Sequence, residues 1–182
     1  MGSACSGKLK LKERRFLILG LDGAGKKTLL GKLGCGEPQH HALFEGFDWW
    51  NVQNGRCNFV SWNLGTDATK PENKPKYKDM FRNTVGIIFV IDSSNRDRFE
   101  EVKTEFWKII NDKCLRDFAL LVFANKQDVQ GAASEDDIKS FIYLWNVRRN
   151  KWNIQASSFK NGDGLEAGLT WLDNETGKNV RK

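Results

Sequence analysis

The chain has 182 residues and a formal net charge of +6, with 40% hydrophobic and 29% charged residues. This length fits one compact domain, and the mixture is too rich in aliphatic and aromatic side chains for a disordered or fibrous protein. No apolar run approaches the roughly 20 residues that cross a bilayer, and the start lacks the apolar stretch of a secretory signal. The composition predicts a single globular domain in the cytosol.

Cysteines and charges exclude two further classes of protein. The four cysteines form no CxxC pair, which argues against a zinc site and a disulfide framework. Positive charge gathers in two tracts: residues 8–15 hold five basic residues and one acidic residue, and residues 70–78 hold four lysines and one glutamate. Neither tract matches a nucleic-acid-binding motif, which spreads basic residues over a face. We therefore expect reduced thiols and no nucleic-acid partner.

Strands and helices alternate along the chain. Short apolar runs bounded by turn residues predict buried parallel strands at 16–19, 86–91 and 119–123. Helical spacing of apolar residues predicts helices at 29–33, 98–111, 138–145 and 165–172. Ser134 with Asp137 fits a capping box before the third helix. Between 47–52 and 57–62, Asn54-Gly55 predicts a tight hairpin that extends one edge of the sheet. The pattern predicts a three-layer α/β domain, with 66–79 as a mobile loop.

A glycine-rich loop follows the first strand directly. It comprises Gly20, Leu21, Asp22, Gly23, Ala24, Gly25, Lys26, Lys27 and Thr28. The run satisfies GxxxxGK, except that Lys27 stands where a serine or threonine ends the motif. Backbone N–H groups of such a loop cradle phosphate oxygens, the following helix directs its positive end at them, and Lys26 reaches the outer phosphates. The alternative is a strand-to-helix turn without a ligand.

A second motif, Asn125-Lys126-Gln127-Asp128, follows the strand that ends at residue 124. The carboxylate of Asp128 can accept two hydrogen bonds from the guanine edge, which adenine cannot supply. The stem of Lys126 can lie over the base, and Asn125 can tie this loop to the phosphate loop. Either motif alone is weak, but together they predict guanine-nucleotide binding at the carboxyl ends of the strands.

Several short sequence motifs resemble those of the Arf and Arf-like branch of the Ras superfamily. They are Gly20-Leu21-Asp22, Phe47 after Gly46, Trp62 before the second switch, residues 121–128, and Gly162-Asp163-Gly164-Leu165. The resemblance implies a P-loop small-GTPase fold with a mostly parallel six-stranded sheet and one antiparallel edge hairpin. It implies a single GTPase-like domain over 16–182 behind a basic arm at 1–15. It also implies GTP or GDP as ligand, held by the phosphate-loop residues together with Gly65, Asn125, Lys126, Asp128, Ser158 and Phe159.

The N-terminus fits the family's habit of lipidation. Met1-Gly2-Ser3 matches N-myristoylation at Gly2, and Cys5 offers a second acylation site. One acyl chain gives only marginal membrane binding, so a second chain and the basic arm matter. We expect a monomer on the cytosolic face of a membrane, Golgi or plasma membrane not distinguished, acting in vesicle trafficking or signalling. An unmodified Gly2 is the alternative.

The resemblance also implies effector contacts. Family effectors grip an aromatic cluster on the strands between the two switches and on the second switch. Here Phe47, Trp62 and Met80 match those positions, and Trp49 and Trp50 add apolar surface to the predicted effector site. The alternative is that some of these rings belong to the core of the sheet.

Four positions of the family's metal and hydrolysis site differ in this chain. Lys27 and Phe44 replace the two threonines that hold Mg²⁺, Asn63 replaces an aspartate, and Asp67 stands at the position of the catalytic glutamine. Lys27 and Asn63 together add two positive charges, each worth roughly 6–7 kcal/mol against a divalent ion at about 5 Å and an effective dielectric of about 20, before screening. An ionised Asp67 cannot donate a hydrogen bond to water. We expect weak magnesium binding and slow or absent GTP hydrolysis.

Several alternatives remain open from the sequence. The ammonium of Lys27 can replace the metal and neutralise phosphate itself. Against this, Phe159 adds bulk where the family has a small residue beside the base, which can crowd the nucleotide. The competing function is a nucleotide-independent pseudo-GTPase that serves as a lipid-anchored adaptor. An ATP-using P-loop enzyme is disfavoured by Asp128.

Overall fold

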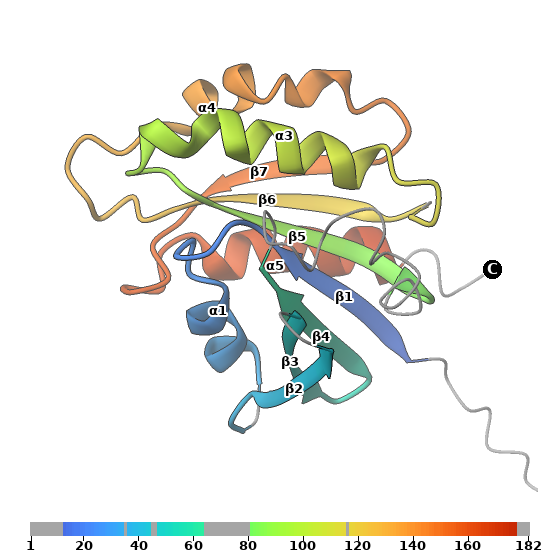
Figure 1. The fold of residues 1–182 in the computed structure, drawn as a ribbon. Coiled ribbons are helices and arrows are strands. Elements are labelled where there is room, and N and C mark those ends of the chain that lie inside the picture. Colours follow the sequence, from blue (N-terminus) through green and yellow to red (C-terminus); the bar gives the residue numbers. More distant parts are fainter. Residues whose placement is uncertain (1–12, 35, 45–46, 64–80, 116, 178–182) are drawn as a thin grey trace, which may run out of the picture.

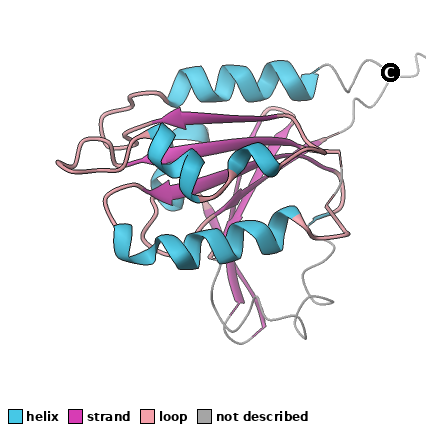
Figure 2. Ribbon diagram, turned by 90° about the horizontal axis from the view of Figure 1, so that it is seen from above, coloured by secondary structure: helices cyan, strands magenta, loops and turns pink. Residues whose placement is uncertain are grey.

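The computed structural model describes residues 13–34, 36–44, 47–63, 81–115 and 117–177. Within these residues, seven strands form one sheet in the order β2-β3-β4-β1-β5-β6-β7. Helices cover both faces of the sheet (Figures 1 and 2). The strands are β1 (Arg14–Leu19), β2 (Gln39–Phe44), β3 (Phe47–Asn54), β4 (Cys57–Trp62), β5 (Thr84–Asp92), β6 (Ala119–Asn125) and β7 (Trp152–Ala156). The helices are α1 (Lys26–Leu33), α3 (Phe99–Ile110), α4 (Glu135–Phe141) and α5 (Leu165–Gly177), with short 3-10 turns η4 (Arg96–Arg98) and η5 (Leu144–Asn146).

The sheet is parallel except at one side. Strand β1 pairs in parallel with β4 and β5, and the parallel pairing continues through β6 to β7. Strand β3 pairs antiparallel with both β4 and β2. The predicted fold class and hairpin are confirmed, because Asn54 and Gly55 lie at the turn between β3 and β4.

The expected strand number of six was wrong, because β2 adds a further strand outside the hairpin. Its sequence, Gln39-His40-His41-Ala42-Leu43-Phe44, lacks the apolar run that marks the buried strands. The rings of His40 and Trp50 stack at 5.1 Å, and those of His41 and Trp49 stack at 4.0 Å. Cross-strand aromatic pairs of this kind stabilise a sheet by about 0.2–1 kcal/mol each, so β3 supplies what the sequence of β2 lacks.

Alternation along the strands divides the core into two layers. Leu17, Leu19, Ile87 and Phe89 face α3 and α4 in one buried cluster. Residues one position along, such as Ile18 and Ile88, face α1 and α5 in the other. Strand β6 is buried along its whole length, as expected for a parallel strand covered on both faces.

The predicted capping box is confirmed at the start of α4. The hydroxyl of Ser134 accepts a hydrogen bond from the N–H of Asp137, and the carboxylate of Asp137 accepts one from the N–H of Ser134. These bonds lower the pKa of Asp137. The helix ends at Phe141, short of the predicted residue 145, because Tyr143 has a left-handed backbone with φ of 53°.

Candidate functional site

The phosphate loop links β1 to α1, and its backbone requires glycine. Gly20 and Gly25 have φ of 146° and 106°. A Cβ at Gly20 would lie 2.3 Å from the carbonyl oxygen of Val90, and one at Gly25 would lie 2.5 Å from Nδ2 of Asn125. The loop is therefore packed tightly between β5 and residues 125–128, which we call the base loop, at the carboxyl end of β1 (Figure 1).

The side chain of Lys26 folds into the phosphate loop. It is 5% exposed, and Nζ donates hydrogen bonds to the carbonyl oxygens of Gly20, at 2.8 Å, and Leu21, at 2.6 Å. Burial lowers its pKa to about 8, and the carboxylate of Asp22 opposes this shift. At neutral pH the ammonium is charged, directed into the loop and available as a point charge for phosphate.

A residue that the sequence did not indicate holds the outer side of this loop. Nη2 of Arg98, from the turn before α3, forms an ion pair with Oδ1 of Asp22 at 2.8 Å. Nη1 of Arg98 also donates to the carbonyl oxygen of Asp22 at 3.3 Å, and the guanidinium is shared with Glu101. The hydrogen bond from Arg98 lowers the pKa of Asp22. The loop is thereby fastened to α3, from a position 76 residues away in sequence.

Lys27, the departure at the end of the motif, is exposed on α1. Its Nζ lies 4.0 Å from the ring centroid of Trp50 on β3. Thr28, the next residue, is also exposed. A charged ammonium has no lone pair, so Lys27 offers no ligand to a metal ion.

The base loop is fixed by Asn125 at the end of β6. Its Nδ2 donates to the carbonyl oxygen of Ala24 in the phosphate loop at 2.8 Å, and its Oδ1 accepts from the N–H of Phe159 at 3.0 Å. Asn125 is 2% exposed, so both bonds are sheltered from water. The predicted tie between the two loops is present, and it extends to the loop after β7.

Lys126 and Asp128 lie on either side of this anchor. Lys126 has a left-handed backbone, φ of 66°, and its Nζ contacts Oδ2 of Asp92 at 2.7 Å. Burial raises the pKa of Asp92, but hydrogen bonds from Lys126 and Ser94 outweigh it and hold the pKa below its usual value. Oδ1 of Asp128 accepts from the hydroxyl of Ser158 at 2.8 Å, and Lys160 lies 3.9 Å from Oδ2. Asp92 had no sequence signal, because it ends a buried strand.

The expectation that Phe159 crowds the base is corrected by the structure. Its ring is 2% exposed and meets the ring of Phe123 edge-on at 5.1 Å. A Cβ at Gly25 would lie 3.3 Å from Cδ2 of Phe159, so the ring fills the core beneath the phosphate loop. Its bulk points away from the surface where the two loops meet.

The predicted effector residues are placed unevenly. Trp49 is half-buried on β3, but Trp62 is 1% exposed and packs on Phe81, so its ring adds nothing to a surface in this structure. Phe47 belongs to β3 and Phe44 to β2, and their side chains are outside the description. Gly2, Cys5, Gly65, Asp67, Met80 and the whole of the 66–79 loop also lie outside the described residues.

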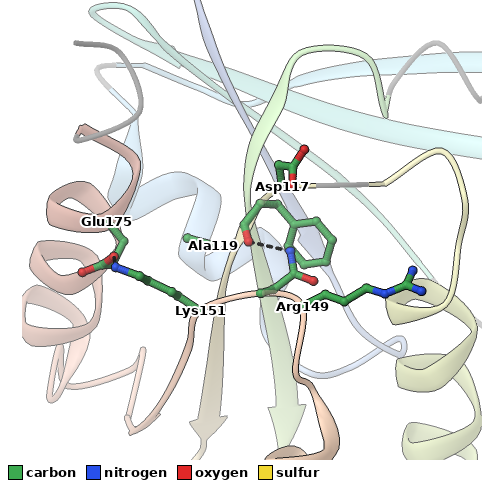
Figure 3. A pocket seen from close by; sticks show the side chains of 7 residues that line it. Asp117, Ala119, Arg149, Lys151 and Glu175 are labelled. Carbon is green, nitrogen blue, oxygen red and sulfur yellow. Dashed lines mark hydrogen bonds and ion pairs between the residues drawn. The ribbon is translucent and has the colours of Figure 1, made fainter. Parts of the chain in front are cut away.

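A cleft of about 520 Å³ (Figure 3) lies at the amino ends of β6 and β7, whereas the phosphate loop and the base loop follow the carboxyl ends of β1 and β6. It is lined by Asp117, Phe118, Ala119, Arg149, Asn150, Lys151 and Glu175. Lys151 and Glu175 form an ion pair across it at 2.8 Å, and Asn150 donates to the carbonyl oxygen of Phe118. The cleft shares no residue with the phosphate or base loop.

The carboxylates near the phosphate loop are already engaged with basic side chains. In the described part of the chain, no group of three His, Cys, Asp or Glu side chains is placed to hold a metal ion. Asp22 and Asp92 are engaged with Arg98 and Lys126. Lys27, whose Nζ lies on the ring of Trp50, supplies no oxygen ligand at the end of the motif.

The fold, the phosphate loop and the base loop together define a P-loop protein of the guanine-nucleotide-binding class. The model of the ADP-ribosylation factor family matches residues 3–176, and the chain belongs to this family. Members of the family are small GTPases that bind GTP and GDP, usually with Mg²⁺, act with protein effectors and serve membrane trafficking. None of the helices in the described ranges is long and apolar enough to cross a membrane.

Proposed function

We propose that this protein binds guanine nucleotides with weakened dependence on magnesium and with slow or absent GTP hydrolysis. The observation that carries the proposal is a contrast within one site. The base loop is fully braced by Asn125, whereas the ammonium of Lys27 lies on Trp50 at the position where the family supplies a metal ligand.

Nucleotide binding rests on two groups of residues. Gly20, Asp22, Gly23, Ala24, Gly25, Lys26 and Thr28 would bind the phosphates, and Gly65 and Lys27 complete this group. Asn125, Lys126, Asp128, Ser158 and Phe159 form the guanine group, in which the N–H of Phe159 already donates to Oδ1 of Asn125. Because Oδ1 of Asp128 accepts from Ser158, guanine competes with that hydroxyl or shares the oxygen with it.

Slow hydrolysis follows from the departures around the outer phosphate. Asn63 removes a negative charge beside the family's metal position, and Lys27 adds a positive one. An ionised Asp67 cannot orient an attacking water through a donated hydrogen bond and repels phosphate. We assign no catalytic residue.

We further propose that the N-terminal arm binds the protein to a membrane. Acyl chains at Gly2 and Cys5, with Lys8, Lys10 and Lys12, would hold the protein on the cytosolic face of an anionic membrane. Arg14 and Arg15 lie in β1, and Arg14 is paired with Asp173. Protein effectors would then contact the β2–β3 side of the sheet, where Trp49 and Trp50 are half-buried. This is a role in vesicle trafficking or signalling.

The test is a titration of purified, nucleotide-stripped protein with fluorescent GDP, GTP and ATP, in magnesium and again in chelator. We expect guanine-specific binding that chelator changes little, with turnover far below family rates. Rapid magnesium-dependent hydrolysis would refute the proposal. Omission of metal should weaken GDP binding by less than about tenfold, because the ammonium of Lys27 replaces the hydroxyl ligand at the end of the motif.

A second candidate function is a lipid-anchored adaptor that binds no nucleotide. Two contacts favour it: Lys26 donates to two carbonyl groups of its own loop, and Asp128 is held by Ser158. Both side chains have protein partners at the positions where nucleotide would be held. Absence of binding to all three nucleotides, in metal and in chelator, would establish the adaptor in place of the first proposal.

A further inference from the structure

Four side chains form a continuous line of contacts from the phosphate-loop helix to the edge of the sheet. Nζ of Lys27 lies 4.0 Å from the ring centroid of Trp50, and the ring of His40 stacks on Trp50 at 5.1 Å. Nε2 of His40 in turn lies 3.3 Å from Oδ1 of Asp48. These contacts therefore join α1 to β3, β3 to β2, and β2 back to β3.

Near each of its two ends, helix α1 contacts the antiparallel pair of strands β2 and β3, which we call the β2–β3 hairpin. Near its carboxyl end, Nδ2 of Asn54 donates to the carbonyl oxygen of Leu33 at 2.8 Å. Near its amino end, beside the phosphate loop, the attachment is the contact of Lys27 with Trp50. Within the described ranges, no carboxylate forms an ion pair with Lys27, so the ring is the partner of its charge there.

The two attachments differ in how they respond to an anion. The hydrogen bond from the side-chain amide of Asn54 to Leu33 is neutral and lies at the far end of α1 from the phosphate loop. The ammonium of Lys27 instead follows directly on Lys26, at the end of the phosphate-binding motif. An exposed ammonium over a half-buried ring is held weakly, and a phosphate oxygen holds a cation more strongly through a charge-assisted hydrogen bond. Lys27 thus has two competing partners, the indole and the outer phosphate.

We propose that Lys27 is a latch between the nucleotide and the β2–β3 hairpin: it holds Trp50 when the phosphate loop is empty and leaves it when the terminal phosphate of a nucleotide, or pyrophosphate, binds there. The inference rests on the proposed nucleotide binding and adds its regulation. Nucleotide occupancy is then transmitted to the Trp50–His40 stack, and so to the edge strand, without a metal ion.

The competition has a reciprocal consequence. If phosphate must displace the indole, removing the indole strengthens nucleotide binding, and removing the ammonium weakens it. Exposed cation–π contacts correspond to about a two- to fivefold change in an equilibrium constant. Trp50→Leu should therefore tighten GDP binding about two- to fivefold, Trp50→Phe less, and Lys27→Met should loosen it.

The contact itself is tested first, without nucleotide. A double-mutant cycle of Lys27→Met and Trp50→Leu should give a coupling of about two- to fivefold in the unfolding constant from urea denaturation. Upfield shifts of the Lys27 ε-methylene protons in NMR, caused by the indole ring, should vanish in Trp50→Leu. Lys32→Met, on the same helix, and Trp145→Leu, a ring 48% exposed elsewhere, serve as matched controls that should leave both signals unchanged.

The release is tested by adding GDP, and separately pyrophosphate, to the full-length protein. The upfield shift should be lost at saturation with either probe; a shift that persists at saturating GDP overturns the latch. GDP binding with no Lys27–Trp50 coupling refutes the latch and leaves the proposed function intact. If neither probe binds, the proposed function and the release fail together, and the coupling then reports a purely structural contact.

Discussion

Burial of Lys26 predicts that the nucleotide-free protein becomes more stable as the pH rises above neutrality. A pKa lowered from 10.5 to about 8 corresponds to about 3 kcal/mol of unfavourable free energy for the charged form in the folded state. Below pH 8 the lysine is charged in both the folded and the unfolded chain, so this cost is fully present. Above pH 10.5 it is neutral in both, and the cost is absent.

Between these limits the unfolded chain binds the extra proton, so the free energy of unfolding rises with pH. From pH 7.5 to 9.5 the rise due to Lys26 is about 2 kcal/mol. Urea denaturation at a series of pH values, with reductant to protect the thiols, measures it. Lys26→Met cannot titrate and has a similar length, so its profile reports every other group.

The difference between wild type and Lys26→Met should rise by about 2 kcal/mol over this range and become flat in saturating GDP, because bound phosphate raises the pKa. A flat difference without nucleotide would refute the argument from burial. If Lys26→Met does not fold, NMR titration of the Lys26 ε-carbon gives the same answer, with a midpoint near pH 8 expected and one near 10.5 contradicting it.

Three further predictions concern the loops. Phe159→Ala should lower the free energy of unfolding by about 3–5 kcal/mol in urea, because the ring fills the core; a loss under 1 kcal/mol would place the ring outside it. Asn125→Ala leaves the Ala24 carbonyl and the Phe159 N–H unpaired, so calorimetry should show a loss of about 1–3 kcal/mol together with weakened GDP binding. Asp128→Asn should reduce GDP affinity at least about tenfold while pyrophosphate affinity stays unchanged, and equal losses for both ligands would contradict a guanine contact.

The buried parallel strands could be predicted because their sequences have no alternative environment. Residues 86–91 and 119–123 are buried and almost wholly apolar, so only a sheet covered on both faces accommodates them. Strand β2 could not be predicted, because two of its six residues are histidines whose place is set by stacking on Trp49 and Trp50. The stability of β2 comes from the neighbouring strand β3, so the local sequence of β2 alone does not indicate a strand.

In the candidate site, too, local motifs could be predicted and partners from distant elements could not. The phosphate loop and the base loop are local motifs, and their spacing alone indicated that they meet. The partners Arg98 and Asp92 come from other elements, so no local pattern connects Arg98 with Asp22 or Asp92 with Lys126. The size of Phe159 is evident from its residue type, but the side of the backbone on which its ring lies is not, and that side decides its role.

The central position of β1 also has a mechanical consequence. The basic arm leads directly into this strand, which pairs in parallel with β4 on one side and β5 on the other, and Arg14 at its start is bonded to Asp173 of α5. A tether at the arm would pull β1 along its own axis, so both ladders of hydrogen bonds would be loaded together in shear and none would be peeled singly. A domain held by its first residues would therefore bear tension through a strand that is paired on both sides.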